Sequence, residues 1–280
     1  ARRLQDAFQA VQHLVGLAAA RYALYQLGVK SGLYRLLTPA AQPHSGTSLS
    51  ARPLALFAAP PPNFPALLSP AEQKALLAQA EDLLAGRFSL YGGDPAPLNI
   101  TPPPPLRHWS QAYPLPASQD IKDLWEPVRF GWAFTLVRAY QLSADERFPA
   151  AFWQAFETFQ AHNPPNQGPH WASAQEVALR LMAWVYTASA LAASPHSPPA
   201  RLQSLSGAVW DHARRIPPTL LYTRAQRNNH LLSEAAGLYT AGLYLQHAPW
   251  RARGWAEFQK ALLDQIAPDG TYGQHSVNYH

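Results

Sequence analysis

Cysteine is absent from the 280 residues of this chain, which excludes disulfide bonds, thiolate metal sites and thiol catalysis. Charged side chains are scarce at 14%, against roughly a quarter in an average domain. The longest apolar run, residues 14–27, is interrupted by Arg21 and Gln26, so no membrane-spanning helix is expected. No initiator methionine and no secretory signal are visible, which leaves a periplasmic, secreted or cytoplasmic location in a bacterium open.

Aromatic residues fill part of the gap left by the missing charges, with 9 Trp and 12 Tyr. Such rings either build a large core or line a groove in which they stack on sugars, bases or other flat ligands. The net charge of +5 favours a polyanionic partner. Because the arginines are scattered and form no Lys/Arg block of the kind found in nucleic-acid tails, nucleic acid is not expected as that partner.

Helical periodicity dominates the chain, and the segments between helices hold proline and glycine. Period-2 alternation is confined to 89–91 and 272–276, so almost nothing predicts a strand. The irregular, proline-rich segments are 38–70 and 88–115, and the first is expected to be a linker or an extended surface arm. Helices are predicted over residues 5–27, 70–86, 119–142, 145–161, 172–193, 199–215, 228–246 and 250–266.

Long helices joined by short breaks predict an all-α fold of antiparallel helical hairpins. Such hairpins close into an (α/α) toroid or stay open as a solenoid, and the lack of a fixed repeat of about 30–50 residues argues against a regular array. We expect residues 1–118 to supply N-terminal helices and a Pro-rich arm that packs on the toroid. Residues 119–280 are expected to form the toroid core, within one structural domain.

A polar cluster, Arg227-Asn228-Asn229-His230, precedes the apolar helix predicted over 228–246. The ordinary interpretation is that Asn228 or Asn229 caps this helix, because asparagine is a favoured N-cap residue. The functional interpretation is a site, since two amides and an imidazole stand where one cap would suffice. Glu234 falls on the same helical face as His230 and is expected to fix its tautomer or raise its pKa. Arg227 favours an anionic ligand.

The end of the sequence, Ser276-Val277-Asn278-Tyr279-His280, is also polar. A tyrosine near a terminus is most often an amphipathic surface ring. When a neighbouring Arg or protonated His lowers its pKa, however, a tyrosine can donate or accept a proton during an elimination. Together with Asn229 and His230, Tyr279 provides an amide, an imidazole and a phenol. These groups can remove a proton from the carbon beside a carboxylate and return one to a leaving oxygen.

Two further stretches combine tryptophan, carboxylate and arginine. Trp171 stands at the mouth of a predicted helix, Ser173 is a plausible cap, and Gln175, Glu176 and Arg180 follow on successive turns. Glu176 and Arg180 are spaced as an i, i+4 pair, so they either form a modest helix-stabilising ion pair or face a binding groove.

The second stretch, 120–129, contains Trp125, Glu126 and Arg129. Glu126 and Arg129 are three residues apart, so a simple ion pair is the ordinary interpretation of this stretch as well.

Several catalytic templates are missing. The sequence has no Gly-rich phosphate loop, no Gly-x-Ser-x-Gly elbow and no His-Glu-x-x-His motif. His230 and Glu234 resemble half of a metal site, but no second pair with matching spacing accompanies them, so neither a metal nor another cofactor is expected. A glycoside hydrolase with two facing carboxyl groups stays open through Asp120, Asp123, Glu126 and Glu176.

Taken together, these segments resemble the N-terminal α-helical region of the heparinase II/III-like polysaccharide lyases. Each segment is weak alone, and their common order along the chain makes the resemblance specific. The segments are Asp120 to Arg129 with Ala139-Tyr140, Asn163-Pro164 with Gly168, Trp171, Glu176-Val177-Ala178 with Arg180, Asn229-His230 with Glu234-Ala235, Pro268-Asp269-Gly270, and Ser276 to His280.

The resemblance implies an (α/α) toroid that is joined in family members to a C-terminal antiparallel β-sandwich, with acidic polysaccharide bound between them and cleaved by β-elimination. Asn229 would stabilise the uronate carboxylate, Tyr279 would donate a proton to the glycosidic oxygen, and His230 would act as base or neutralise the carboxylate. The resemblance further implies that the substrate is bound by residues around these three: Trp125, Arg129, Trp171, Gln175, Glu176, Arg180, Arg227 and Glu234.

The β-sandwich, a further catalytic histidine and any structural metal belong to sequence that this chain does not contain, so little or no activity is expected of it alone. Since sulfate recognition calls for clustered Arg and Lys, unsulfated uronates are the favoured substrate. The alternatives are an (α/α) glycoside hydrolase and a non-catalytic glycan-binding or scaffold protein.

Overall fold

The computed structural model describes the backbone of the chain except residues 1, 55–62, 112, 114–119, 227 and 273–280, and side chains from residue 16 onward. The all-α prediction is confirmed, since the sheet among these residues has two short antiparallel strands, β1 (Arg87–Ser89) and β2 (Pro95–Pro97). The α-helices are α1 (Arg2–Ser31), α2 (Leu33–Leu37), α4 (Pro70–Leu84), α5 (Ile121–Val128), α6 (Ala133–Ser143), α7 (Arg147–His162), α8 (Ala174–Ala190), α9 (Pro199–Arg215), α10 (Leu220–Gln226), α11 (Asn229–Tyr244) and α12 (Ala248–Gln265). Short 3-10 turns are η1 (Phe64–Leu67), η2 (Leu90–Gly92), η3 (Pro169–Trp171) and η4 (Pro217–Thr219).

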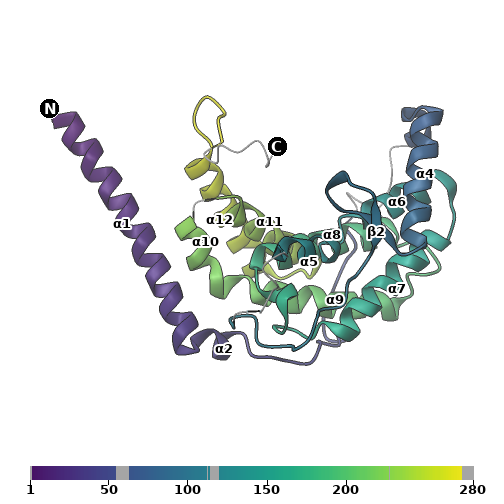
Figure 1. Ribbon diagram of the computed structural model, residues 1–280, viewed down its shortest axis with the longest axis horizontal. Coiled ribbons are helices and arrows are strands. Elements are labelled where there is room, and N and C mark those ends of the chain that lie inside the picture. The colour runs from purple at the N-terminus through teal and green to yellow at the C-terminus, as the bar shows by residue number, and fades with distance from the viewer. Residues whose placement is uncertain (1, 55–62, 112, 114–119, 227, 273–280) are drawn as a thin grey trace.

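Consecutive helices pack as hairpins, namely α6 with α7, α8 with α9 and α11 with α12. The hairpins are joined sideways, because α8 also contacts α6 and α11. Figure 1 shows the resulting open arc, with α1 at one end and α4 at the other. The fold is an incomplete (α/α) toroid, as the helix pattern predicted. None of the described helices is at once long and apolar enough to cross a membrane.

The helix predicted over 119–142 is wrong in one respect, because the chain breaks it into α5 and α6 at Phe130. Phe130 has a φ of 60°, in the left-handed region that side chains other than glycine seldom adopt. Its ring is fully buried and packs on Trp132 and edge-on against Trp184. Burial of this ring offsets the backbone cost, and amphipathic spacing alone could not reveal the turn.

Aromatic side chains of α7 and α8 fill the centre of the core. Phe156 and Phe159 meet Trp184 edge-on, with ring centroids 5.1 and 5.3 Å away. Trp153 is buried beside them and donates its indole N–H to Ser197 Oγ at 2.9 Å. This part of the aromatic content therefore builds the core rather than a ligand groove.

The Pro-rich segment 39–54 lies as an extended arm against the helices. The amide of His44 donates to Asp211 Oδ2 on α9 at 2.8 Å, and Arg52 N donates to Tyr244 O at the end of α11 at 2.9 Å. The arm approaches α9 so closely that a Cβ added to Gly207 would lie 1.9 Å from the carbonyl oxygen of His44. Glycine is therefore required at this position for the arm to dock.

Two serines stand at the N-cap positions of helices and behave differently. Ser69 forms a capping box with Glu72 at the start of α4, as its Ser-Pro-x-Glu pattern predicts. Ser173 occupies the N-cap position of α8, but its side chain accepts no hydrogen bond from the helix. The prediction of a Ser173 side-chain cap is therefore wrong.

Candidate active site

The first turn of α11 presents Asn229 and His230. Asn228 is the N-cap, since its side-chain oxygen accepts a hydrogen bond from the amide of His230 at 3.1 Å. The capping interpretation is thus confirmed for Asn228. Asn229 and His230 follow the cap, both half-buried, at a helix N-terminus whose dipole favours anionic groups.

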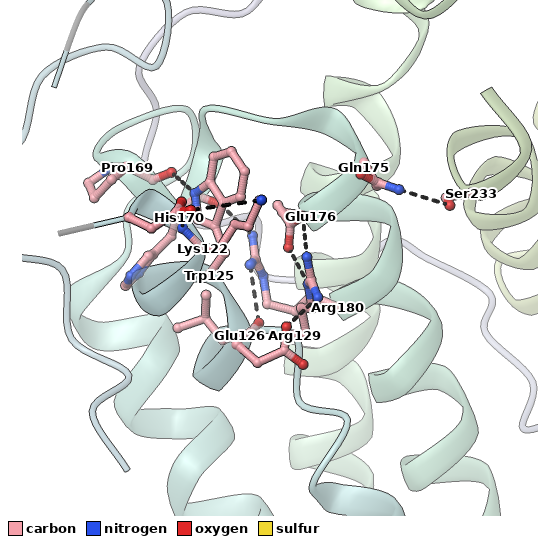
Figure 2. A network of polar contacts seen from close by, with 12 residues as sticks. Lys122, Trp125, Glu126, Arg129, Pro169, His170, Gln175, Glu176, Arg180 and Ser233 are labelled. Carbon is pink, nitrogen blue, oxygen red and sulfur yellow. Dashed lines mark hydrogen bonds and ion pairs between the residues drawn. The ribbon is translucent and has the colours of Figure 1, made fainter. Parts of the chain in front are cut away.

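The first turn of α8 lies opposite that of α11. Gln175 Nε2 donates to Ser233 Oγ at 3.3 Å, and Ser233 Oγ donates in turn to the carbonyl oxygen of Asn229 at 3.0 Å. Figure 2 shows Gln175 reaching across to Ser233. This chain of hydrogen bonds connects the candidate Gln175 with the backbone of the candidate Asn229 and fixes the spacing of the two helices.

Arg129, at the end of α5, joins two carboxylates (Figure 2). Its Nε and Nη2 donate to the two oxygens of Glu176 at 2.6 and 2.9 Å, which makes the pair bidentate. Its Nη1 donates to Glu126, so the Glu126–Arg129 pair predicted from spacing is confirmed. The guanidinium is already engaged by protein carboxylates, so its part in the site is to hold Glu176 in place.

The Glu176–Arg180 ion pair predicted from i, i+4 spacing is wrong, because Glu176 pairs with Arg129 and Arg180 turns into the core. Arg180 is 0% exposed, and its guanidinium donates to Val128 O at 3.2 Å and to His170 O at 3.0 Å. The Arg129–Glu176 pair is favoured because it is bidentate and charge-assisted. A surface i, i+4 pair would contribute only about 0.2–0.5 kcal/mol.

His230 is neutral around neutral pH. Burial lowers its pKa; the carboxylate of Glu176 opposes this shift, and the charge of Arg129 adds to it. A neutral imidazole can accept a proton, which suits a general base. The charges that act on His230 come from Glu176 and Arg129.

Glu234 lies away from His230, although helical spacing predicted that the two would interact. The Glu234 side chain is buried, and burial raises its pKa well above the usual value, while the charge of Arg215 and a hydrogen bond with Thr223 oppose the shift. The structure therefore places Glu234 in the interior, and Arg215 rather than His230 is its charged neighbour.

The two tryptophans proposed for substrate binding have different surroundings. Trp125 is half-buried and donates its indole N–H to Pro169 O at 2.9 Å, which fixes α5 against η3. Trp171 is 1% exposed, and its ring centroid lies 4.4 Å from that of His212 in the core. Trp171 therefore contacts protein on all sides and supports the site from below.

Two candidates, Arg227 and Tyr279, lie outside the described residues. Among the residues that the structure does describe, no group of three or more His, Asp or Glu side chains is placed to hold a metal ion. The candidates that come together are therefore Asn229, His230, Gln175, Glu176 and Arg129, from α11, α8 and α5.

Tyr91 is a neighbour of the site that the sequence patterns did not single out. It lies at the tip of the β1–β2 hairpin with a φ of 52° and is 65% exposed. The part of the side chain that is buried raises its pKa, and the charge of Glu126 adds to this rise. A strained, exposed aromatic ring beside a cluster of charged groups is typical of a ligand contact. The sequence feature that could have drawn attention to Tyr91 is the Gly92-Gly93 pair that follows it, because two glycines mark a tight turn.

Replacing Glu176 by Gln is expected to lower the pKa of His230 further, because the negative charge that raises this pKa disappears while Arg129 keeps lowering it. The measurement is a proton NMR titration of His230, assigned with the His230→Gln variant, and it requires no turnover. Glu126→Gln is the matched control, since it removes the negative charge of Glu126, the other partner of Arg129, but leaves the Arg129–Glu176 contact. A His230 pKa that rises or stays unchanged in Glu176→Gln would contradict this coupling.

Comparisons with known proteins agree with the helical architecture. The family described as heparinase II/III N-terminus matches residues 108–280. A heparin-sulfate lyase of Bacteroides thetaiotaomicron is 24% identical over 159 residues, which cover 54% of this chain and 22% of that protein. The structure of heparan sulfate lyase HepC from Pedobacter heparinus superimposes with a TM-score of 0.57 at 20% identity, over 91% of this chain and 36% of that one. The structural likeness establishes the fold, and the chain spans only a minor part of each relative.

Proposed function

This chain belongs to the heparinase II/III N-terminal family, and we propose that it forms the α-helical part of a polysaccharide lyase that cleaves uronate-containing acidic polysaccharide by β-elimination. The observation that carries the proposal is the position of Asn229 and His230 in the first turn of α11, with the Arg129–Glu176 pair close enough to act on the charge of His230. A C-terminal β-sandwich is part of the same proposal, because each relative is far longer than its matched part.

In the proposed reaction, Asn229 binds the uronate carboxylate through its side-chain amide and the N-terminal end of α11 adds a favourable dipole. The proton on C5 is only weakly acidic, and stabilising the negative charge that spreads onto the carboxylate makes its removal feasible. His230 accepts this proton as a neutral base. The electron pair forms the C4–C5 double bond, the bond from C4 to the glycosidic oxygen breaks, and Tyr279 protonates that oxygen.

A glycoside hydrolase is the weaker proposal. It needs one carboxyl group as acid and a second as base or nucleophile on opposite sides of the bond. Glu126 and Glu176 are two of the candidate carboxylates, and both are bound by Arg129. Glu176 is 1% exposed and both of its oxygens accept from Arg129, so it is not placed to act on a glycosidic bond, which favours elimination over hydrolysis.

The proposal predicts that the protein generates unsaturated uronate from heparan sulfate or another uronate polysaccharide. The ultraviolet absorbance of the new C4–C5 double bond is recorded for this chain and for the product of the complete gene. A hydrolase would release reducing ends without this absorbance, and a non-catalytic binding protein would produce neither. Reducing ends that accumulate without the absorbance would overturn the lyase proposal.

A further inference from the structure

A basic hollow of about 220 Å³ lies between α1 and the helices α10, α11 and α12. Figure 1 shows α1 flanking these helices at one end of the arc. Three cationic side chains line the hollow: Arg21 from α1, Arg224 from α10 and Lys260 from α12. They are far apart in the sequence, so the scatter of Arg and Lys along the chain does not carry over to the fold.

Arg224 is held in a fixed orientation. Its Nε donates to Glu257 Oε2 at 3.0 Å and its Nη2 donates to the other oxygen of the same carboxylate, which is 8% exposed. This bidentate pair offsets the charge of Arg224 and fixes the position of its guanidinium at the edge of the hollow.

Arg21 and Lys260 are the cations of the hollow that remain beside the Arg224–Glu257 pair. Within the described part of the chain, neither side chain forms an ion pair. Asp264 also lines the hollow, so counting Asp264 and Glu257 against the three cations leaves one positive charge in excess. Two cations that face a common concave space from different helices are suited to bind an anionic group between them.

The hollow and the candidate centre both include residues of α11. Leu231 lines the hollow and directly follows Asn229 and His230 in the first turn of α11. Leu17 of α1 adds a second apolar surface.

We propose that this hollow is an anion subsite that binds a sulfate or carboxylate group of the glycan. The inference rests on the proposed function, because it takes the ligand to be an acidic glycan. Arg21 and Lys260 bind the anionic group, and Arg224, held in place by Glu257, completes the basic side of the hollow.

The test is a double variant, Arg21→Gln with Lys260→Gln, compared with Arg253→Gln with Lys74→Gln. The control pair has the same change in charge at exposed positions that do not line the hollow. Dissociation constants for heparan sulfate are measured for both, and KM and kcat wherever turnover is observed. The hollow variant is expected to raise Kd or KM about tenfold more than the control and to leave kcat within about twofold, since binding rather than chemistry is affected.

A desulfated, N-acetylated form of the same glycan identifies the anionic group. If sulfate occupies the hollow, the variant loses affinity for heparan sulfate alone; if carboxylate does, the loss appears with both glycans. Equal affinities of the hollow variant and the control pair would overturn the subsite. If the product of the complete gene bound the glycan but formed no unsaturated product, this would instead count against the proposed function, and the affinities of the two variants would still decide the subsite.

Discussion

Arg180→Met is expected to lower the free energy of unfolding by about 4 kcal/mol or more, because each buried acceptor left without its donor costs about 1–3 kcal/mol. Three acceptors depend on this guanidinium: Val128 O, His170 O and His212 Nε2, the last at 2.9 Å. The free energy of unfolding of a native protein is about 5–15 kcal/mol, so the substitution removes a large share of it. Urea denaturation followed by tryptophan fluorescence measures the difference.

The surroundings of Arg180 explain why methionine cannot replace it. The guanidinium carbon lies 4.6 Å from the ring centroid of Phe159 and 5.9 Å from those of Trp171 and Trp184. Burial lowers the pKa of Arg180 to about 9, so the side chain remains charged at neutral pH and its charge is met by aromatic faces and carbonyl oxygens. The residue joins α8 to the end of α5, to η3 and to α9.

Two further variants make this prediction specific. Arg180→Lys keeps the charge but cannot reach three acceptors in the fixed geometry of a guanidinium, so an intermediate loss is expected. Arg138→Met removes an exposed arginine whose hydrogen bonds stay within its own helix, and it should change stability by less than about 0.5 kcal/mol. If Arg180→Met unfolded at the same urea concentration as Arg138→Met, the proposal that Arg180 stabilises the fold by joining α8 to α5, η3 and α9 would be refuted.

Local sequence signals were sufficient for several contacts within one helix. The Ser69 capping box and the Glu126–Arg129 pair each involve residues within three positions, and the asparagine cap of α11 was narrowed to Asn228 or Asn229. The helical hairpins follow from the same periodicity, because each helix carries its own apolar face.

Contacts between helices could not be read from spacing. Arg129 binds Glu176 from 47 residues away and leaves Arg180 free to enter the core, which reverses the pairing that the i, i+4 rule predicts. The turn at Phe130 depends on the pocket that its ring fills, and the basic hollow gathers cationic side chains from three separate helices. In each case the outcome depends on tertiary packing, which local patterns do not encode.

Asn229→Ala is expected to reduce the rate of elimination by roughly a hundredfold to a thousandfold, the size of loss observed when one donor to a developing charge is removed. The reason is that the side-chain amide is proposed to stabilise the carboxylate only as C5 loses its proton, so kcat falls more than affinity. Initial rates of double-bond formation and binding of the same glycan, measured on the product of the complete gene, separate the two effects.

The neighbouring asparagine supplies the matched control. Asn228 caps α11 through its side chain, so Asn228→Ala should cost about 1 kcal/mol of stability while kcat stays within a few-fold of wild type, and Asn228→Ser should retain the cap as well. Asn229→Asp changes little in volume but places a negative charge against the uronate, so its rate should fall at least as far as that of Asn229→Ala. If Asn228→Ala and Asn229→Ala lost activity equally and in proportion to stability, the amide of Asn229 would have a structural role only. Opposite behaviour of two adjacent asparagines would mean that the first residue of this turn builds the helix and the second acts on the substrate.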